Sequence, residues 1–84
     1  KYMIEIRKQV LDLVRSVSGN ENIIEDSLLL DEGWIDSLTT ITLLTEVEEK
    51  FSIVIEADEL SHENFNTIEN ISKLISSKNG NKTI

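Results

Sequence analysis

The stretch DEGWIDSLTTITLLTEVEEKF, residues 31–51, decides the fold. It passes from a Gly-containing turn, through Asp36 and Ser37, into a run whose apolar residues recur at helical spacing. Either Asp36 or Ser37 can be the N-cap, because a side-chain oxygen there accepts a free backbone N–H of the first turn. We therefore predict a helix over residues 37–50 with an apolar stripe facing the core. The stripe consists of Leu38, Ile41, Leu44 and Val47, and Phe51 continues it.

Two further helices are predicted toward the two ends of the chain. Residues 2–17 form an amphipathic pattern, and the turn residues at 18–20 end it. Asn66 or Thr67 can cap a last helix over residues 67–77, followed by a frayed tail over residues 78–84. The predicted inner faces are Ile6, Val10, Leu13, Val14 and Val17 in the first helix, and Ile68, Ile71, Leu74 and Ile75 in the last.

The connections between these helices are harder to assign. Residues 19–36 have no clean period but are rich in apolar side chains, so we expect a loop lying on the core, with a short helix possible over residues 25–30. Alternating Phe51, Ile53 and Ile55 suggest a short strand, but a lone strand would leave its backbone groups unpaired. We prefer an extended segment followed by a short helix over residues 57–62. The prediction is one all-α domain over residues 1–84, a small bundle of three long helices and one short one, with a long first loop.

Composition and charge narrow the classes of function. The formal net charge is −8, and residues 16–72 contain 14 acidic residues but one basic residue, Lys50. An acidic surface repels phosphate backbones and anionic lipid headgroups, which argues against nucleic acid and membrane surfaces as partners. No apolar run is long enough to cross a bilayer. The absence of Cys excludes disulfides and thiolate metal sites. We expect a cytoplasmic monomer without membrane insertion.

Asp36-Ser37-Leu38 at the start of an apolar helix, after a long loop containing Gly33, resembles the acyl carrier protein family. The resemblance extends from the first predicted helix to about residue 76. It includes Glu48-Glu49-Lys50-Phe51 at the end of the second helix, the Ile53-x-Ile55 segment, and Asn66-Thr67-Ile68 before the last helix. The family contains fatty-acid carriers, D-alanyl carriers and the carrier domains of polyketide and peptide assembly lines.

The resemblance implies a non-catalytic protein that carries 4′-phosphopantetheine covalently on Ser37. The arm would be attached by a phosphopantetheinyl transferase and would hold an acyl or aminoacyl group as a thioester. Further implied partners are a loading synthetase and a downstream acyltransferase or synthase. The arm would supply the thiol that this chain lacks. The resemblance assigns partner recognition to Asp36, Leu38, Thr39, Thr42, Leu43, Glu46 and Glu49, with Leu43 expected to be exposed.

Some positions depart from the family pattern. Thr39 and Thr42 stand where typical fatty-acid carriers have acids, and Trp34 stands where small aliphatic residues are commoner. The segment ELSHENFNTIENI, residues 59–71, resembles D-alanyl carriers. We therefore expect a discrete carrier served by a specialised synthetase or assembly line.

Alternatives from other classes remain open at this point. An unmodified acidic interaction module would use Ser37 as a helix cap alone. A hydrolase would need a base near Ser37, and the single His of the chain is His62. His62 with Asp58, Glu59 and Glu63 could hold a metal, but such a set is more often a solvated helix face. Trp34 could line a pocket for cargo, although packing the loop onto the core is the commoner role.

Overall fold

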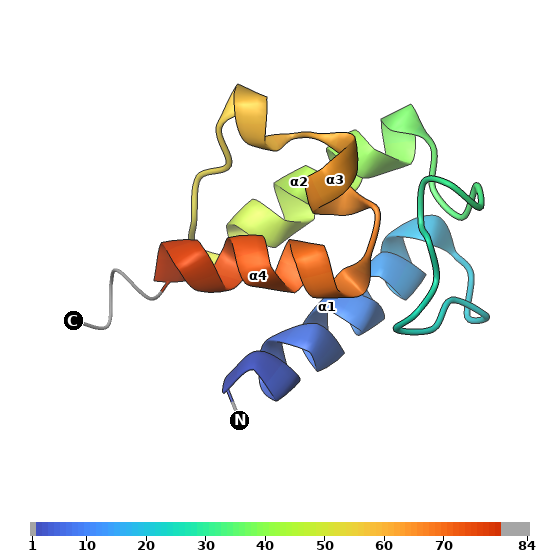
Figure 1. Cartoon of the computed structure of the whole chain (residues 1–84), viewed down its shortest axis with the longest axis horizontal. Coiled ribbons are helices and arrows are strands. Elements are labelled where there is room, and N and C mark those ends of the chain that lie inside the picture. Colours follow the sequence, from blue (N-terminus) through green and yellow to red (C-terminus); the bar gives the residue numbers. More distant parts are fainter. Residues whose placement is uncertain (1, 80–84) are drawn as a thin grey trace.

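Helices make up the regular structure of the computed structural model, which describes residues 2–79. Three long helices, α1 (Tyr2–Ser18), α2 (Ser37–Phe51) and α4 (Ile68–Asn79), are joined by short elements, the 3₁₀ turn η1 (Ala57–Glu59) and helix α3 (His62–Phe65). Figure 1 shows α1 crossing beneath α4, with α2 behind them and the long loop on one side. α1 packs against both α2 and α4, and α3 packs against α4. The residues described contain no strand, and the predicted all-α bundle of three long helices and one short one is confirmed.

The core lies where α1, α2 and α4 meet, and the loops contribute to it. The long first loop lies on the core as predicted, because three of its aliphatic side chains are buried. Burial of these side chains removes apolar surface from water and holds a segment that has no regular secondary structure. The buried apolar residues are Ile6, Val10 and Val14 of α1, Ile23, Leu29 and Ile35 of the loop, Leu43 and Val47 of α2, Ile53 and Ile55 after it, Phe65 of α3, and Ile68, Ile71 and Ile75 of α4.

The buried face of α2 differs from the predicted stripe. Leu38 is 76% exposed and Ile41 is 49% exposed, whereas the buried residues of α2 are Thr40, Leu43 and Val47. An α-helix turns by about 100° per residue, so a strict i, i+3 series drifts by about 60° at each step. Leu38 and Val47 therefore lie on opposite sides of the helix. The predicted stripe was wrong in its first half for this reason.

Local signals mark the end of α1 and the start of α4. Gly19 follows α1 at a φ of +70° and donates its N–H to the Arg15 carbonyl at 2.8 Å. This left-handed conformation after a helix is one that glycine adopts without steric cost. Thr67 caps α4, because its hydroxyl accepts the Asn70 N–H at 3.0 Å. Between the two residues that the sequence offered as caps, Thr67 is therefore the one used.

Two short elements differ from expectation. Residues 25–30 form turns and no helix, with the Ser27 hydroxyl accepting the Ile24 N–H at 3.0 Å. The helix expected over 57–62 is split into η1 and α3, because Ser61 is extended and its hydroxyl accepts the Asn64 N–H, so that a new helix starts there. α4 continues to Asn79, beyond the predicted start of the frayed tail, and residues 80–84 of that tail lie outside the described residues.

The segment after α2 is extended and pairs with no strand in the described chain. Its buried residues Ile53 and Ile55 alternate with Val54, which is exposed. The Glu48 side chain accepts the Ile55 N–H at 2.8 Å, and the Glu48 carbonyl accepts the Ile53 N–H at 3.2 Å. These bonds satisfy backbone groups that a strand partner would otherwise satisfy.

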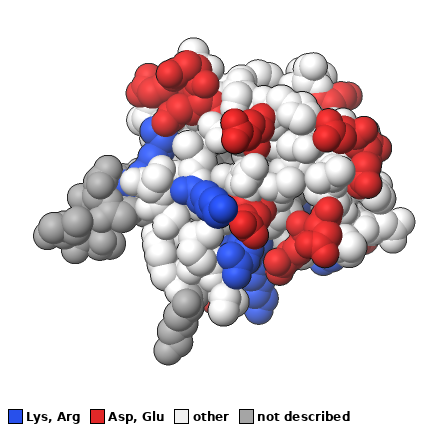
Figure 2. All heavy atoms as spheres, in the orientation of Figure 1, with Lys and Arg blue, Asp and Glu red and all other residues white. Residues whose placement is uncertain are grey.

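Figure 2 shows how charge is distributed on one face of the molecule. Lys and Arg side chains gather over α1 and α4, and Asp and Glu side chains lie both among them and toward the margins of the face. Several cations are paired with acids: Lys78 lies 2.8 Å from Glu59, and Lys73 lies 3.1 Å from Glu69. Within residues 2–79, none of the helices has the length and apolar character needed to cross a membrane.

Candidate functional site

Ser37 is the first residue of α2, and its side chain is exposed. The residue before it, Asp36, is the N-cap: its backbone is extended and its carboxylate accepts the Thr39 N–H at 2.8 Å. The Asp36 carbonyl also accepts the Thr40 N–H at 2.9 Å and the Thr40 hydroxyl at 2.7 Å. Asp36 therefore fixes the first turn of the helix and leaves the Ser37 hydroxyl available to solvent. Of the two possible caps in the sequence, Asp36 takes the role.

The carboxylate of Asp36 is held in its ionised form. Hydrogen bonding from the Thr39 backbone N–H is the main cause that lowers the pKa of Asp36 below its usual value. A bond to a carboxylate favours the charged state over the protonated state. A negative charge at a helix N-terminus is also stabilised by the helix dipole. The residue beside the candidate serine is thus a stable anion that a partner enzyme could recognise.

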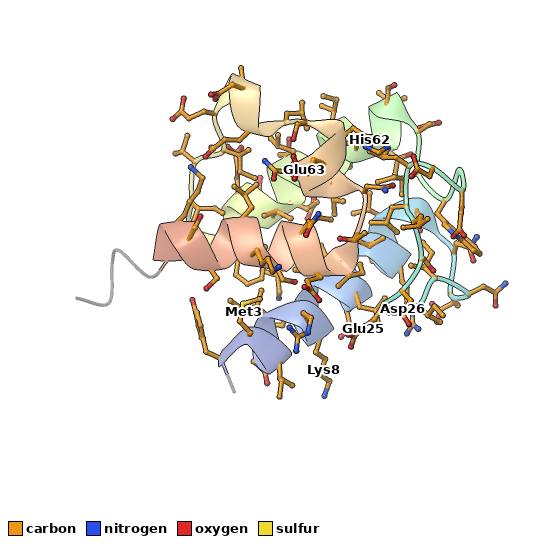
Figure 3. All side chains as sticks on the ribbon, viewed as in Figure 1. Met3, Lys8, Glu25, Asp26, His62 and Glu63 are labelled. Atoms are coloured by element: carbon orange, nitrogen blue, oxygen red, sulfur yellow. The ribbon has the colours of Figure 1, made fainter. Side chains whose placement is uncertain are left out.

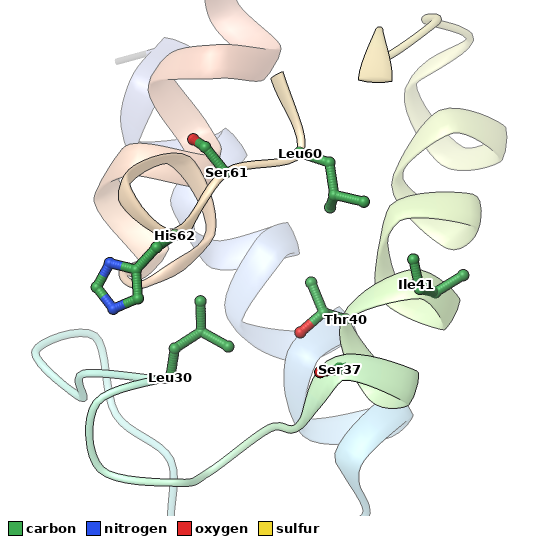
Figure 4. Close-up of a pocket in the computed structure, with 7 residues that line it drawn as sticks. All are labelled: Leu30, Ser37, Thr40, Ile41, Leu60, Ser61 and His62. Atoms are coloured by element: carbon green, nitrogen blue, oxygen red, sulfur yellow. The ribbon is translucent and has the colours of Figure 1, made fainter. Parts of the chain in front are cut away.

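A cavity of about 290 Å³ opens beside Ser37. Three segments form it: the long loop, the first turns of α2, and the connection between η1 and α3 (Figure 4). Its lining is mainly aliphatic, with hydroxyl groups and an imidazole at the rim. The lining residues are Leu30, Ser37, Thr40, Ile41, Leu60, Ser61 and His62. Such a space suits a small, mainly apolar group held next to the serine.

Within residues 2–79, no catalytic base is paired with Ser37. Among the described residues, none forms a hydrogen bond with its hydroxyl. His62 lines the same cavity on its opposite side (Figure 4), and its Nε2 lies 2.7 Å from the Asp31 carboxylate. A serine nucleophile requires an adjacent base to take its proton. The arrangement therefore offers a hydroxyl for another enzyme to modify and does not form a Ser-His pair.

The predicted recognition residues fall into two groups. Most of them lie on the outer surface of the protein, with Thr39 half-buried: Asp36, Leu38, Thr39, Thr42, Glu46 and Glu49. Leu43 differs, because its side chain is fully buried, with 0% exposure. The prediction that Leu43 is exposed was wrong, since the same rotation of the helix that exposes Leu38 turns Leu43 into the core. Leu43 is a core residue and makes no surface for a partner.

Several residues near Ser37 were missed by the sequence reasoning. Ile41 had been assigned to the core and is half-exposed beside the cavity. Leu30 and Leu60 reach the same cavity from connections whose path the sequence pattern did not determine. A helical wheel centred on Val47 would have placed Ile41 outside the buried face, because a turn of 100° per residue puts the two side chains on different faces of α2. No local signal indicated that Leu30 and Leu60 would line the same cavity.

The possible metal site is absent from the part of the chain that is described. There, no group of three or more His, Asp or Glu side chains could hold a metal ion. Figure 3 shows His62 and Glu63 on α3, well separated from the Glu25 and Asp26 pair in the long loop. Trp34 packs partly against the core, and its indole N–H donates to Glu32 at 2.9 Å. It does not line the cavity beside Ser37.

Comparison with known proteins gives a consistent match. A family model described as "Phosphopantetheine attachment site" matches residues 8–75, which include Ser37. Among curated proteins, the chain is 32% identical over 75 residues to a D-alanyl carrier protein of Lactococcus lactis subsp. lactis, covering 87% of this chain and 95% of that protein. It is 33% identical over 67 residues to a D-alanyl carrier protein of Listeria welshimeri serovar 6b, covering 77% and 86%. A D-alanyl carrier protein of Lactobacillus delbrueckii subsp. bulgaricus is 30% identical over 78 residues, with 84% and 95% covered.

Proposed function

This chain belongs to the acyl carrier protein family, whose members bear phosphopantetheine, and from that premise we propose that Ser37 is its attachment site and a D-alanyl group its cargo. The family assignment makes the protein a non-catalytic carrier with a 4′-phosphopantetheine group covalently bound to a serine. It also implies interaction with a phosphopantetheinyl transferase and with loading and transfer enzymes. The alternative of an unmodified interaction module is not favoured.

One observation supports Ser37 above the other serines of the chain. Its exposed hydroxyl begins α2, directly after a capping aspartate and beside a cavity. A phosphodiester at a helix N-terminus is favoured by roughly 0.3–1 kcal/mol at an exposed site. Ser61 lines the same cavity, but its hydroxyl accepts the Asn64 N–H and caps α3. Ser27 and Ser72 are buried.

The residues around Ser37 would position the phosphopantetheine arm and pack against it, and would catalyse no step themselves. The bound arm supplies a thiol, which forms a thioester with the cargo. Asp36 holds the first turn of α2 so that Ser37 stays exposed. Leu30, Ile41 and Leu60 offer an apolar wall on which the dimethyl portion of the arm could rest. The cavity volume of about 290 Å³ is compatible with a small cargo.

We assign D-alanine as the cargo because the matched relatives are named D-alanyl carrier proteins and match most of this chain. This agrees with the departures of Thr39 and Thr42 from the pattern of fatty-acid carriers. The loading partner would then be an aminoacyl-activating synthetase, and a transfer enzyme would remove the cargo. We further propose that residues 1–84 act as one monomeric carrier domain in the cytoplasm, the compartment that holds the coenzyme A pool.

The partner-binding face would be the exposed side of α2 and the cap before it. It combines apolar Leu38 and Ile41 near Ser37 with acidic Glu46 and Glu49 further along the helix. Partner interfaces of this kind should be small, because one carrier must leave each enzyme to reach the next. The negative charge would mainly speed encounter with basic enzyme surfaces.

The test has two stages, each with a matched control. The purified protein is incubated with coenzyme A, magnesium and a broad-specificity phosphopantetheinyl transferase, and intact mass is measured. The parent and Ser61→Ala should each gain one phosphopantetheinyl group, and Ser37→Ala should gain none. A folded parent without gain, and without an arm already present, would disprove attachment at Ser37.

The second stage concerns the cargo. The arm-bearing protein is incubated with ATP, a D-alanine-activating synthetase and either D-alanine, L-alanine or a fatty acid with its own synthetase. We expect a thioester, cleaved by hydroxylamine, with D-alanine in preference to the others. Equal or better loading by a fatty-acid synthetase would reject D-alanine while leaving the carrier assignment intact.

A further inference from the structure

Asn66, at the junction of α3 and α4, holds the loop that leads to Ser37. It is 9% exposed and follows α3 directly. Its backbone carbonyl accepts the Leu29 N–H at 2.7 Å, and its side-chain Oδ1 accepts the N–H groups of Leu30 and Asp31 at 2.9 and 3.0 Å. One residue thus satisfies three consecutive amides of a segment more than thirty positions earlier in the chain.

Asp31 completes this contact from the loop side. Its Oδ2 accepts the Asn66 Nδ2 donor at 3.1 Å, and its Oδ1 lies 2.7 Å from His62 Nε2. The hydrogen bond from His62 is the main cause that lowers the pKa of Asp31. Residues at both ends of the short helix α3 therefore contact the same loop residue, Asp31. We refer to Asp31, His62 and Asn66 as the loop clamp.

The held segment connects directly to the attachment site. Leu29 accepts the Ile35 N–H at 3.0 Å through its carbonyl, so the loop folds back on itself just before Asp36 caps α2. Leu30, whose amide is held by Asn66, lines the cavity shared with Ser37. His62 lines that cavity from the other side. The loop clamp thus fixes both the path into Ser37 and two walls of the cavity next to it (Figure 4).

We propose that Asn66, acting through the loop clamp, is a positioning residue that holds the segment before Ser37 in the form that the phosphopantetheinyl transferase recognises. This inference rests on the proposed function of Ser37. Asn66 touches neither the hydroxyl nor any reacting atom, and its effect passes through Leu30 and Asp31. Loss of the clamp should loosen the loop locally, because buried Leu29 and Ile35 still anchor that segment to the core.

Local loosening has a distinct kinetic signature. If only part of the population has the competent loop, the apparent affinity of the transferase falls by that fraction. The KM for the carrier should then rise while kcat and the KM for coenzyme A stay near the parent values. Removing a side chain that bonds two partly buried amides should raise this KM on the order of 10-fold.

The experiment compares Asn66→Ala with the matched control Asn70→Ala. Asn70 also uses its side chain to bridge elements, donating to the Glu63 carbonyl at 2.9 Å, but it forms none of the hydrogen bonds that hold residues 29–31. Transferase kinetics are measured below the unfolding transition of each variant. Amide hydrogen exchange is followed in parallel. We expect Asn66→Ala to raise the KM and to speed exchange at Leu30 and Asp31, and Asn70→Ala to do neither.

A compensating pair tests the chemistry of the clamp. Asn66→Asp keeps an acceptor for the loop amides but sets a second carboxylate against Asp31, so it should raise the KM. Adding Asp31→Asn places an amide donor at position 31 opposite the new carboxylate at position 66, so the pair regains its hydrogen bond. The KM should then return to within about 3-fold of the parent value. If Asn66→Ala does not fold, this pair decides the matter.

The outcomes separate the two proposals. A parent that is never modified overturns the assignment of Ser37 and this inference with it. If the parent is modified and a folded Asn66→Ala or Asn66→Asp variant has the same KM as the parent, the proposed role of Asn66 is overturned and the assignment of Ser37 stands. Equal losses in Asn66→Ala and Asn70→Ala would reduce the role of Asn66 to general stability and also overturn it.

Discussion

Replacing Leu43 with Ala should destabilise the protein far more than the same replacement of Leu38, five positions earlier on α2. Leu43 is 0% exposed and Leu38 is 76% exposed. The two changes delete the same atoms from the same helix, and the change in helix propensity from Leu to Ala is small. A large difference between the two variants therefore measures burial.

The magnitude follows from the packing. Truncating a fully buried Leu to Ala costs about 2–5 kcal/mol, from lost apolar burial and the cavity left behind. Truncating an exposed side chain that packs on nothing usually changes stability by at most about 0.5 kcal/mol. A domain of this size has a free energy of unfolding of roughly 4–12 kcal/mol, so Leu43→Ala removes a large share of it. The expected fall in Tm is about 4–8 °C for each kcal/mol lost.

Urea unfolding followed by circular dichroism measures both variants, and fluorescence of the single Trp, Trp34, reports independently from the long loop. Should Leu43→Ala prove too unstable to study, Leu43→Met keeps most of the volume and should cost less than about 1.5 kcal/mol. Equal losses for the two alanine variants, or a greater loss for Leu38→Ala, would refute the burial assigned to α2.

Three further outcomes are expected. Gly33→Ala should lower the free energy of unfolding by roughly 1–2 kcal/mol in urea titrations, because Gly33 has a φ of +74°, which strains the backbone of a residue with a Cβ even though the Cβ itself would meet no neighbour. Gly33→Asn should lower it less. An unchanged urea midpoint in Gly33→Ala would contradict this prediction. The free energy of unfolding should decrease as the pH falls from about 5 toward 2, because the pKa values of Asp31, Asp36 and Glu59 are lowered in the folded state and the unfolded state therefore binds protons more readily. The Asp36→Asn variant, in which Asn can still cap α2, should lose less stability over this range. Identical pH profiles for the parent and the variant would argue against a contribution from Asp36. Ile41→Ser should leave the free energy of unfolding within about 0.5 kcal/mol of the parent, because Ile41 is half-exposed. It should nevertheless lower kcat/KM of the loading enzyme, and full loading activity would remove Ile41 from the partner-binding face of α2.

The sequence alone determined the features that depend on local chemistry. The apolar periods of α1 and α4, a cap at either Asp36 or Ser37, and the placement of Ser37 at a helix start depend on residues close together in the chain. The same holds for the likeness to acyl carriers, since the Asp-Ser-Leu tripeptide and its flanking loop are contiguous. The family and its covalent cofactor were predicted from these and are confirmed.

Tertiary structure decided which side of α2 is buried and what surrounds Ser37. Short apolar patterns such as Leu38, Ile41 and Leu44 fit more than one rotation of a helix, and the packing of α2 into the core selects Leu43 and Val47. The cavity and the loop clamp join residues some thirty positions apart, for example Leu30 and Asn66. Such contacts form because buried amides of the loop require acceptors, and which acceptor meets them depends on how the whole chain packs.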